Sequence, residues 1–253
     1  MRMLALFLAV VGWMTGAPPS ARAQEQCDVP AELVAPMDVL PIVARRIAAK
    51  GPIKIIAIGS ASTKGVGLTS ARAAYPERLR LELAKRLPGI QVTVVNLGAA
   101  RETAQQMVAR FKTEVIAEKP ALVIWQTGTV DAVRSVMVDD FGQSIAKGID
   151  KLHAAGIDVV LMNLQYSWRM AVAMNDQPFN DVMATLADAH DAPLFDRYGI
   201  MKHWIENGRF DFDNAPEAER PARADAAHAC LGKLLAEFVL KAAAEVSPNH
   251  VQR

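Results

Sequence analysis

The chain has 253 residues, of which 51% are hydrophobic, and its 28 Lys and Arg nearly balance its 27 Asp and Glu, for a net charge of +1. Because the two signs of charge are interspersed without a basic stripe, the composition argues against a nucleic-acid-binding protein, and we expect no nucleic acid partner. The length fits one large globular domain with a full core.

The first residues have the pattern of an export signal. A short positive start precedes an almost wholly apolar stretch over residues 3–15, and an A-x-A cleavage pattern ends at Ala23. The stretch is too short to cross a membrane, and no later one reaches 18 uninterrupted apolar residues, so we expect no stable membrane insertion. We predict a signal peptide over residues 1–23, a single domain over residues 24–253, and a periplasmic or secreted location. An uncleaved anchor is the alternative.

Strand and helix patterns alternate along the rest of the chain. Short β-branched apolar runs predict strands, and periodic segments that stop at Pro or Gly predict helices. In chain order we expect a strand at 54–58, a helix at 75–86, a strand at 91–95, a helix at 102–118, a strand at 121–125, a helix at 139–155, a strand at 159–163, a helix at 179–190, a short strand at 193–195 and a closing helix at 225–246. A polar loop over residues 207–223 is a candidate wall of a site.

This alternation predicts the fold class. Near-continuous apolar strands separated by amphipathic helices indicate a parallel sheet covered on both faces. We therefore expect an α/β fold, a three-layer α/β/α sandwich with a five-stranded parallel, flavodoxin-like sheet. In such folds the ligand site lies at the carboxyl ends of the strands.

Two cysteines, Cys27 and Cys230, follow the predicted signal. An oxidising compartment permits a disulfide between them, which would join the N-terminal segment to the last helix. Two free thiols are the alternative. No Cys or His spacing indicates a metal site, so we expect no metal.

Four short blocks fall at the ends of predicted elements. They are Gly59-Ser60-Ala61-Ser62-Thr63-Lys64-Gly65 after the first strand, Asn96-Leu97-Gly98 after the second, Gln126-Thr127-Gly128-Thr129-Val130-Asp131 after the third, and Asp225-Ala226-Ala227-His228 at the expected start of the last helix. In this order they resemble the SGNH (GDSL-type) hydrolase superfamily, over about residues 54–246.

The resemblance implies a role for each block. The family's nucleophilic serine falls at Ala61, and the asparagine that donates to the oxyanion falls at Val130. The backbone donor falls at Gly98, the general base at His228, and the carboxylate that orients the base at Asp225. Two catalytic groups are therefore substituted. Without the resemblance, Asp225 and His228 read as a helix cap and a surface residue.

The substitutions leave two functions open. Ala61 has no nucleophilic atom, and an oxyanion donor is worth about 10²–10³ in rate, so the first reading is a degenerate family member that keeps an acyl- or glycan-binding pocket. The alternative is an active carboxylic-ester hydrolase that uses Ser60 or Ser62 with His228 and Asp225. The resemblance implies a small acylated or carbohydrate ligand and no organic cofactor.

A third reading keeps only the flavodoxin-like fold and places a phosphate-bearing ligand at the Gly59–Gly65 turn. The chain lacks the glycine patterns of nucleotide-binding loops, which argues against this reading.

Overall fold

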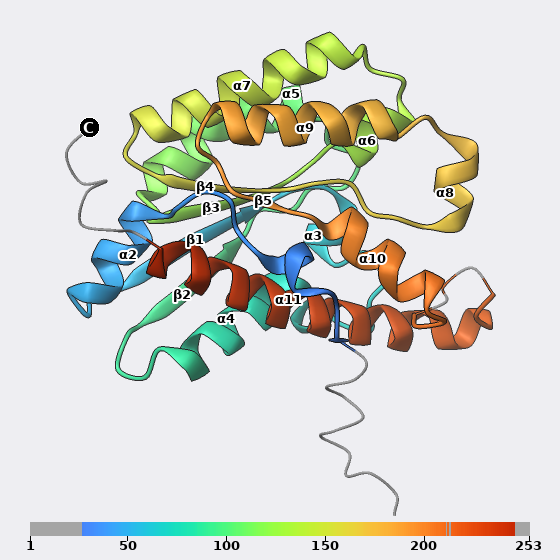
Figure 1. The fold of residues 1–253 in the computed structure, drawn as a ribbon, viewed down its shortest axis with the longest axis horizontal. Helices are drawn as coiled ribbons and strands as arrows, with labels where there is room; N and C mark the ends of the chain where they lie inside the picture. The colour runs from blue at the N-terminus through green and yellow to red at the C-terminus, as the bar shows by residue number, and fades with distance from the viewer. Residues whose placement is uncertain (1–26, 211, 213, 246–253) are drawn as a thin grey trace, which may run out of the picture.

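The structure, a computed structural model, describes residues 27–210, 212 and 214–245 (Figure 1). The predicted signal peptide at residues 1–23 lies outside the described residues. The larger helices are α2 (Pro41–Ala48), α4 (Tyr75–Arg86), α5 (Ala104–Arg110), α7 (Val138–Ala154), α9 (Gln177–Ala189), α10 (Arg197–Glu206) and α11 (Arg220–Ala244). The short helices are α3 (Ala61–Lys64), α6 (Thr129–Val133) and α8 (Trp168–Ala173).

The sheet has five parallel strands in the order β2-β1-β3-β4-β5. They are β1 (Ile53–Ile58), β2 (Val92–Asn96), β3 (Leu122–Gln126), β4 (Asp158–Met162) and β5 (Leu194–Phe195). Ile56 on β1 lies opposite Val95 on β2 and Val123 on β3, so apolar side chains of the inner strands align across the sheet. The predicted three-layer, flavodoxin-like fold is confirmed.

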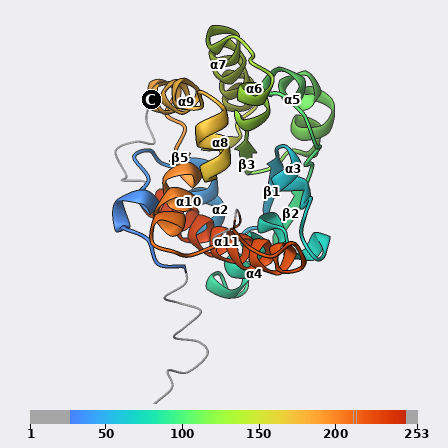
Figure 2. The same cartoon turned by 90° about the vertical axis from the view of Figure 1, so that its right-hand side faces the viewer.

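The two faces of the sheet are covered by different helices (Figures 1 and 2). Because side chains alternate along a strand, Ile55 and Ile124 face a core shared with α2, α4 and α11, while Ile56 and Trp125 face a core shared with α5, α7 and α9. This double burial explains why the inner strands are apolar at almost every position.

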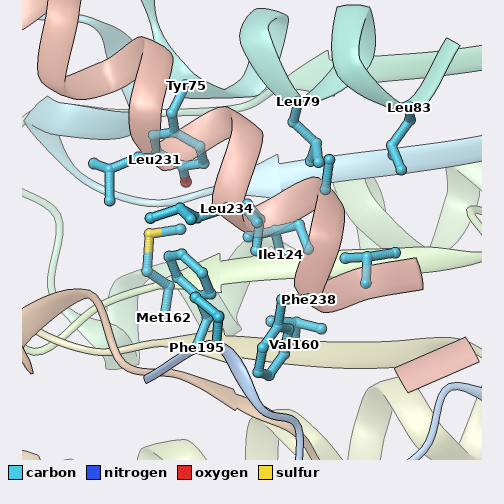
Figure 3. Close-up of a cluster of buried hydrophobic side chains, with 14 of the residues drawn as sticks. Tyr75, Leu79, Leu83, Ile124, Val160, Met162, Phe195, Leu231, Leu234 and Phe238 are labelled. Atoms are coloured by element: carbon cyan, nitrogen blue, oxygen red, sulfur yellow. The ribbon is translucent and has the colours of Figure 1, made fainter. Parts of the chain in front are cut away.

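Figure 3 shows the first of these cores. Leu79 and Leu83 of α4 and Leu231 and Phe238 of α11 pack over the sheet, and Tyr75 enters the same cluster. The Phe195 ring of β5 meets the Phe238 ring edge-on, with centroids 5.5 Å apart. Tyr75, at the start of α4, therefore belongs both to the core and to the carboxyl edge of the sheet, where its hydroxyl finds polar partners.

The last helix begins earlier than the sequence predicts. The expected start at residue 225 is wrong, because α11 starts at Arg220 and is preceded by a 3₁₀ turn, Glu217–Glu219. Pro221 lies in its first turn, where a missing N–H costs nothing and the fixed φ suits a helix. The predicted loop over 207–223 therefore ends at residue 216.

Other predicted elements also need correction. The helix expected at 102–118 is interrupted: α5 begins after the capping box of Thr103 and Gln106 and gives way to a π-helical turn, Phe111–Val115, and a 3₁₀ turn, Ile116–Glu118. The sequence pattern did not predict the helices α2, α3, α6, α8 and α10 or the 3₁₀ turns Ala31–Val34 and Ala71–Ala73.

A disulfide joins Cys27 to Cys230, with Cα atoms 5.1 Å apart. This is the pairing that the sequence predicted, and the alternative of two free thiols is wrong. It fixes the start of the described chain to α11. Within the described residues, no helix is both long enough and apolar enough to cross a membrane.

Candidate functional site

The four sequence blocks lie at the carboxyl ends of the strands or beside them. Helix α3 follows β1, the Asn96–Gly98 segment follows β2, and α6 follows β3, so all three lie at one edge of the sheet. Figure 2 views the molecule toward this edge, with α3, α6, α8 and α10 near the viewer. The N-terminal half of α11 reaches the same edge through hydrogen bonds from Asp225 and His228, as described below.

The turn after β1 is held by Gln126 at the end of β3. Its side-chain carbonyl accepts from Ser60 N at 3.0 Å, from Ser60 Oγ at 3.2 Å and from Thr63 Oγ1 at 3.1 Å. The turn packs so closely that a Cβ on Gly59 would lie 2.2 Å from Thr63 Oγ1. Ser60 is 5% exposed, so its hydroxyl is a buried structural donor.

Tyr75 extends this network into the core. Its hydroxyl lies 2.9 Å from Thr63 Oγ1. Because the single hydroxyl proton of Thr63 is donated to Gln126, the Tyr75 hydroxyl is the donor to Thr63. Burial raises the pKa of Tyr75 to about 12, so the phenol stays protonated and neutral.

Ser62 points to a different partner. Its Oγ accepts from Arg197 Nη1 at 2.7 Å, across 135 residues of chain. Arg197 begins α10, directly after β5, and is 1% exposed. The two serines that flank Ala61 are therefore bound to Gln126 and to Arg197, on different elements.

Gly98 lies against α3, where the resemblance expects the oxyanion donor. Its N–H donates to Asn96 Oδ1 at 2.9 Å, and Asn96 Nδ2 in turn donates to the Thr63 carbonyl at 2.7 Å. A Cβ on Gly98 would lie 2.3 Å from Lys64 N. Glycine is required here because two backbone segments meet.

Val130 occupies the first turn of α6 and offers no side-chain donor. Its neighbour Asp131 is 1% exposed and accepts from Ala104 N at 3.0 and 3.2 Å, which ties α6 to the start of α5. Burial raises the pKa of Asp131 against the lowering effect of these hydrogen bonds. The third block thus joins elements together.

Asp225 and His228 have separate partners. The Asp225 carboxylate accepts from Thr69 N at 3.0 Å and from the Thr69 hydroxyl. His228 Nδ1 accepts from Tyr75 N at 3.1 Å. With α11 starting at Arg220, Asp225 lies inside the helix, so the reading of Asp225 as its N-cap is wrong.

His228 is a weak base in this setting. Burial, together with the positive charges of Arg197 and Arg78, lowers its pKa to about 4 against the opposing effect of Asp225. The imidazole is therefore neutral at pH 7.

The sequence does not single out three residues that organise this edge: Tyr75, Thr69 and Arg197. Arg197 follows β5 after one residue, Asp196, which is the N-cap of α10. It therefore lies just after the end of a strand, as the other blocks do. This place after a strand is the feature of the sequence that could have marked Arg197 as a site residue. Among the described residues, no group of His, Cys, Asp and Glu is arranged to hold a metal ion.

The fold and the order of the strand-end blocks place the chain in the SGNH hydrolase superfamily, as the resemblance predicted. The chain belongs to the non-GDSL lipase-like family, whose model matches residues 26–245. Its family is therefore one of esterase-like proteins.

Individual relatives are more distant. The chain is 27% identical over 111 residues to esterase TesA of Pseudomonas aeruginosa, and the aligned part covers 44% of this chain and 54% of TesA. Among solved structures it is similar to a two-domain esterase, CEX, active on acetylated mannans, with a TM-score of 0.67 and 18% identity, covering 85% of this chain and 57% of that one. It is also similar to a mutant of Axe2, an acetyl-xylooligosaccharide esterase from Geobacillus, with a TM-score of 0.60 and 19% identity over 74% and 94% of the two chains. The chain thus spans little more than half the length of TesA and CEX in these matches.

Proposed function

We propose that the chain is a degenerate member of the ester hydrolase and deacylase class, which has lost hydrolysis and keeps a site for an acyl group or a glycan. The observation that carries the proposal is the hydrogen bond from Tyr75 N to His228 Nδ1. A backbone N–H can only donate, so the neutral imidazole carries its proton on Nε2. A general base of a serine hydrolase needs the opposite tautomer, with Nδ1–H bound to a carboxylate and Nε2 free to accept.

The flanking serines support the same proposal. An active hydrolase that used Ser60 or Ser62 would need the hydroxyl within about 2.6–3.2 Å of the base. Among the hydrogen bonds of these described residues, none joins either serine to His228. Ser60 is buried against Gln126, and Ser62 is bound to a cation, so this alternative would require the turn to rearrange.

Exposed apolar side chains around the same edge support a retained ligand site. Val66 follows α3, Val133 ends α6, and Trp168 and Val172 lie one helical turn apart on α8. All four are more than half exposed, with Trp168 at 63%. An indole face and aliphatic side chains suit a sugar ring or an acyl chain. Two of the structural neighbours are esterases of acetylated glycans, so acetylated oligosaccharides are the ligands to try first.

Labelling with a serine-reactive fluorophosphonate tests the loss of chemistry. We expect no label on the natural protein. We also expect none at position 61 of the Ala61→Ser variant, because His228 would have no free Nε2 lone pair to accept the proton. Label on Ser60 or Ser62 that disappears in His228→Ala would establish the active alternative. Label on the introduced hydroxyl of Ala61→Ser would refute the argument from the tautomer. An active serine esterase serves as the positive control.

Tryptophan fluorescence tests the ligand site. Trp125 and Trp204 are buried, so Trp168 is the exposed tryptophan of the described chain and dominates the response to a ligand at this edge. Acetylated manno- or xylo-oligosaccharides should quench or shift its emission saturably, and deacetylated oligosaccharides and Trp168→Leu provide the controls. A response identical for acetylated and deacetylated sugars would exclude the acetyl group as the feature recognised.

We further propose that residues 1–23 are a signal peptide, that residues 24–253 form one domain, and that the protein is periplasmic or secreted. The Cys27–Cys230 disulfide supports an oxidising location, because structural disulfides persist there. The intact mass of protein purified from the periplasm would show whether Gln24 is the mature N-terminus.

A further inference from the structure

Arg197 is a buried cation at the carboxyl edge of the sheet. Burial lowers its pKa to about 10, which still leaves the guanidinium charged at neutral pH. Its neighbour Asp196 is not its counter-ion, since Asp196 Oδ1 accepts instead from Gly199 N and from Asn163 Nδ2. The phenol of Tyr75 stays neutral and supplies no negative charge.

The only hydrogen bond of the Arg197 side chain to a described residue is Nη1 to Ser62 Oγ. Its Nε and Nη2 atoms are buried and have no hydrogen-bond partner among the described residues. A buried charge is costly to hold unless it is paired and hydrogen-bonded, so two unmet donors on one guanidinium require an explanation.

The two unmet donors are the pair that binds carboxylates. Nε–H and the nearest Nη2–H lie on one edge of the planar guanidinium and point the same way, which matches two carboxylate oxygens. Arg80 shows this arrangement within the same chain, with Nε and Nη2 donating to the two Glu77 oxygens at 2.8 and 2.7 Å. In Arg197 the Nε and Nη2 donors of this edge have no partner among the described residues, while Ser62 accepts from Nη1 on the opposite side of the guanidinium.

We propose that Arg197 binds the carboxylate of a small organic acid at the carboxyl ends of the strands, through Nε and Nη2. The inference rests on the proposed function, because it gives the altered site a ligand class: the acids that ester hydrolysis on such a frame would release. Ser62 orients the guanidinium plane, and the neutral His228 adds no positive charge beside Arg197.

Thermal unfolding and NMR of the mature, disulfide-bonded protein at pH 7 and fixed ionic strength test the proposal. Acetate, propionate and butyrate should raise the unfolding temperature saturably, because a ligand that binds only the folded state stabilises it. Acetamide, which has the shape of acetate without its charge, should not. In ¹H–¹⁵N spectra the Arg197 Nε–H signal, assigned by its loss in Arg197→Met, should shift on titration.

Two variants and one control sharpen the test. Arg197→Met should abolish the carboxylate effect. Arg197→Lys keeps the charge but loses the paired donors, so the apparent affinity should fall about 10- to 100-fold, the factor of one charge-assisted hydrogen bond. Arg80→Met is the matched control, because that fork is already occupied by Glu77, and the carboxylate response should be unchanged.

The outcomes separate the two proposals. No carboxylate effect beyond that of acetamide and chloride, or an equal effect in Arg197→Met, overturns the carboxylate site. Stronger binding of phosphate or chloride than of any carboxylate overturns the assigned ligand class. If Arg197→Met does not fold, the wild-type titration and Arg197→Lys still decide. Turnover of esters by the same samples overturns the proposed loss of hydrolysis, whatever the titration shows.

Discussion

Asp158→Asn should change how the stability of the protein depends on pH. The Asp158 carboxylate begins β4, is 5% exposed, and accepts from Val43 N in the first turn of α2 at 2.8 Å. Burial raises its pKa to about 6, against the lowering effect of these backbone donors. An asparagine keeps the acceptor and removes the charge.

The expected magnitude follows from the shift. The pKa of Asp158 rises from an ordinary value of 3.8 to about 6, a shift of roughly two units. Each unit is worth about 1.4 kcal/mol, so keeping the carboxylate charged in the folded protein costs about 3 kcal/mol. Because the folded pKa lies above the unfolded one, the favourable contribution is present below about pH 4 and is lost as the pH rises through 6. The unfolding free energy of Asp158→Asn minus that of the wild type should therefore grow by about 2.5 kcal/mol from pH 4 to pH 7, because part of the effect lies below pH 4.

Urea unfolding at pH 4, 5, 6 and 7, followed by circular dichroism with the disulfide intact, measures this difference. Any constant effect of the amide on packing cancels, as do the groups that titrate equally in both proteins. Asp181→Asn is the control, because that carboxylate also accepts one donor, from Gln177, but is exposed. A difference that is flat, or that shrinks toward pH 7, would refute the reasoning from burial.

Two further predictions concern covalent and steric constraints. Replacing Cys27 and Cys230 by alanine should lower the unfolding free energy by up to about 5 kcal/mol, because the bridge joins residues 203 positions apart. Urea unfolding of this variant and of the disulfide-bonded wild type measures the difference, and a loss below about 1 kcal/mol would contradict the prediction. Gly98→Ala should destabilise the protein by about 1–3 kcal/mol or more, because the added Cβ would meet the Lys64 backbone. Gly51→Ala should be near neutral in the same assay, because the nearest atom to its added Cβ is 3.8 Å away.

The sequence predicts elements well where burial or helix-breaking residues mark them. The predicted helix at 75–86 matches α4, and the predicted strand at 54–58 differs from β1 by one residue. A β-branched apolar run of this length is typical of a buried strand, so its place is easy to predict. The start of α11 was missed because its first turns are charged and contain proline, a composition shared by loops and helix starts. Periodicity says little about such segments.

The strand-end blocks predict the location of the site but not its hydrogen bonds. The partner of Ser62 comes from Arg197, and the partner of His228 comes from the backbone of Tyr75, so each bond joins residues more than 130 positions apart. A D-x-x-H spacing places two residues on one helix. It does not specify which nitrogen of the imidazole accepts a hydrogen bond, and that choice decides whether the residue can act as a base.

The altered features of the site are mutually consistent. If position 61 is the lost nucleophile position, as proposed, no proton has to be removed there, and His228 Nδ1 is free to satisfy the Tyr75 N–H at the start of α4. Arg197 would hinder catalysis by such a histidine, because its charge lowers the basicity of the imidazole. The same charge favours a bound carboxylate. One residue thus disfavours proton transfer and favours an anion, and this links the proposed loss of hydrolysis to the ligand class proposed for the site.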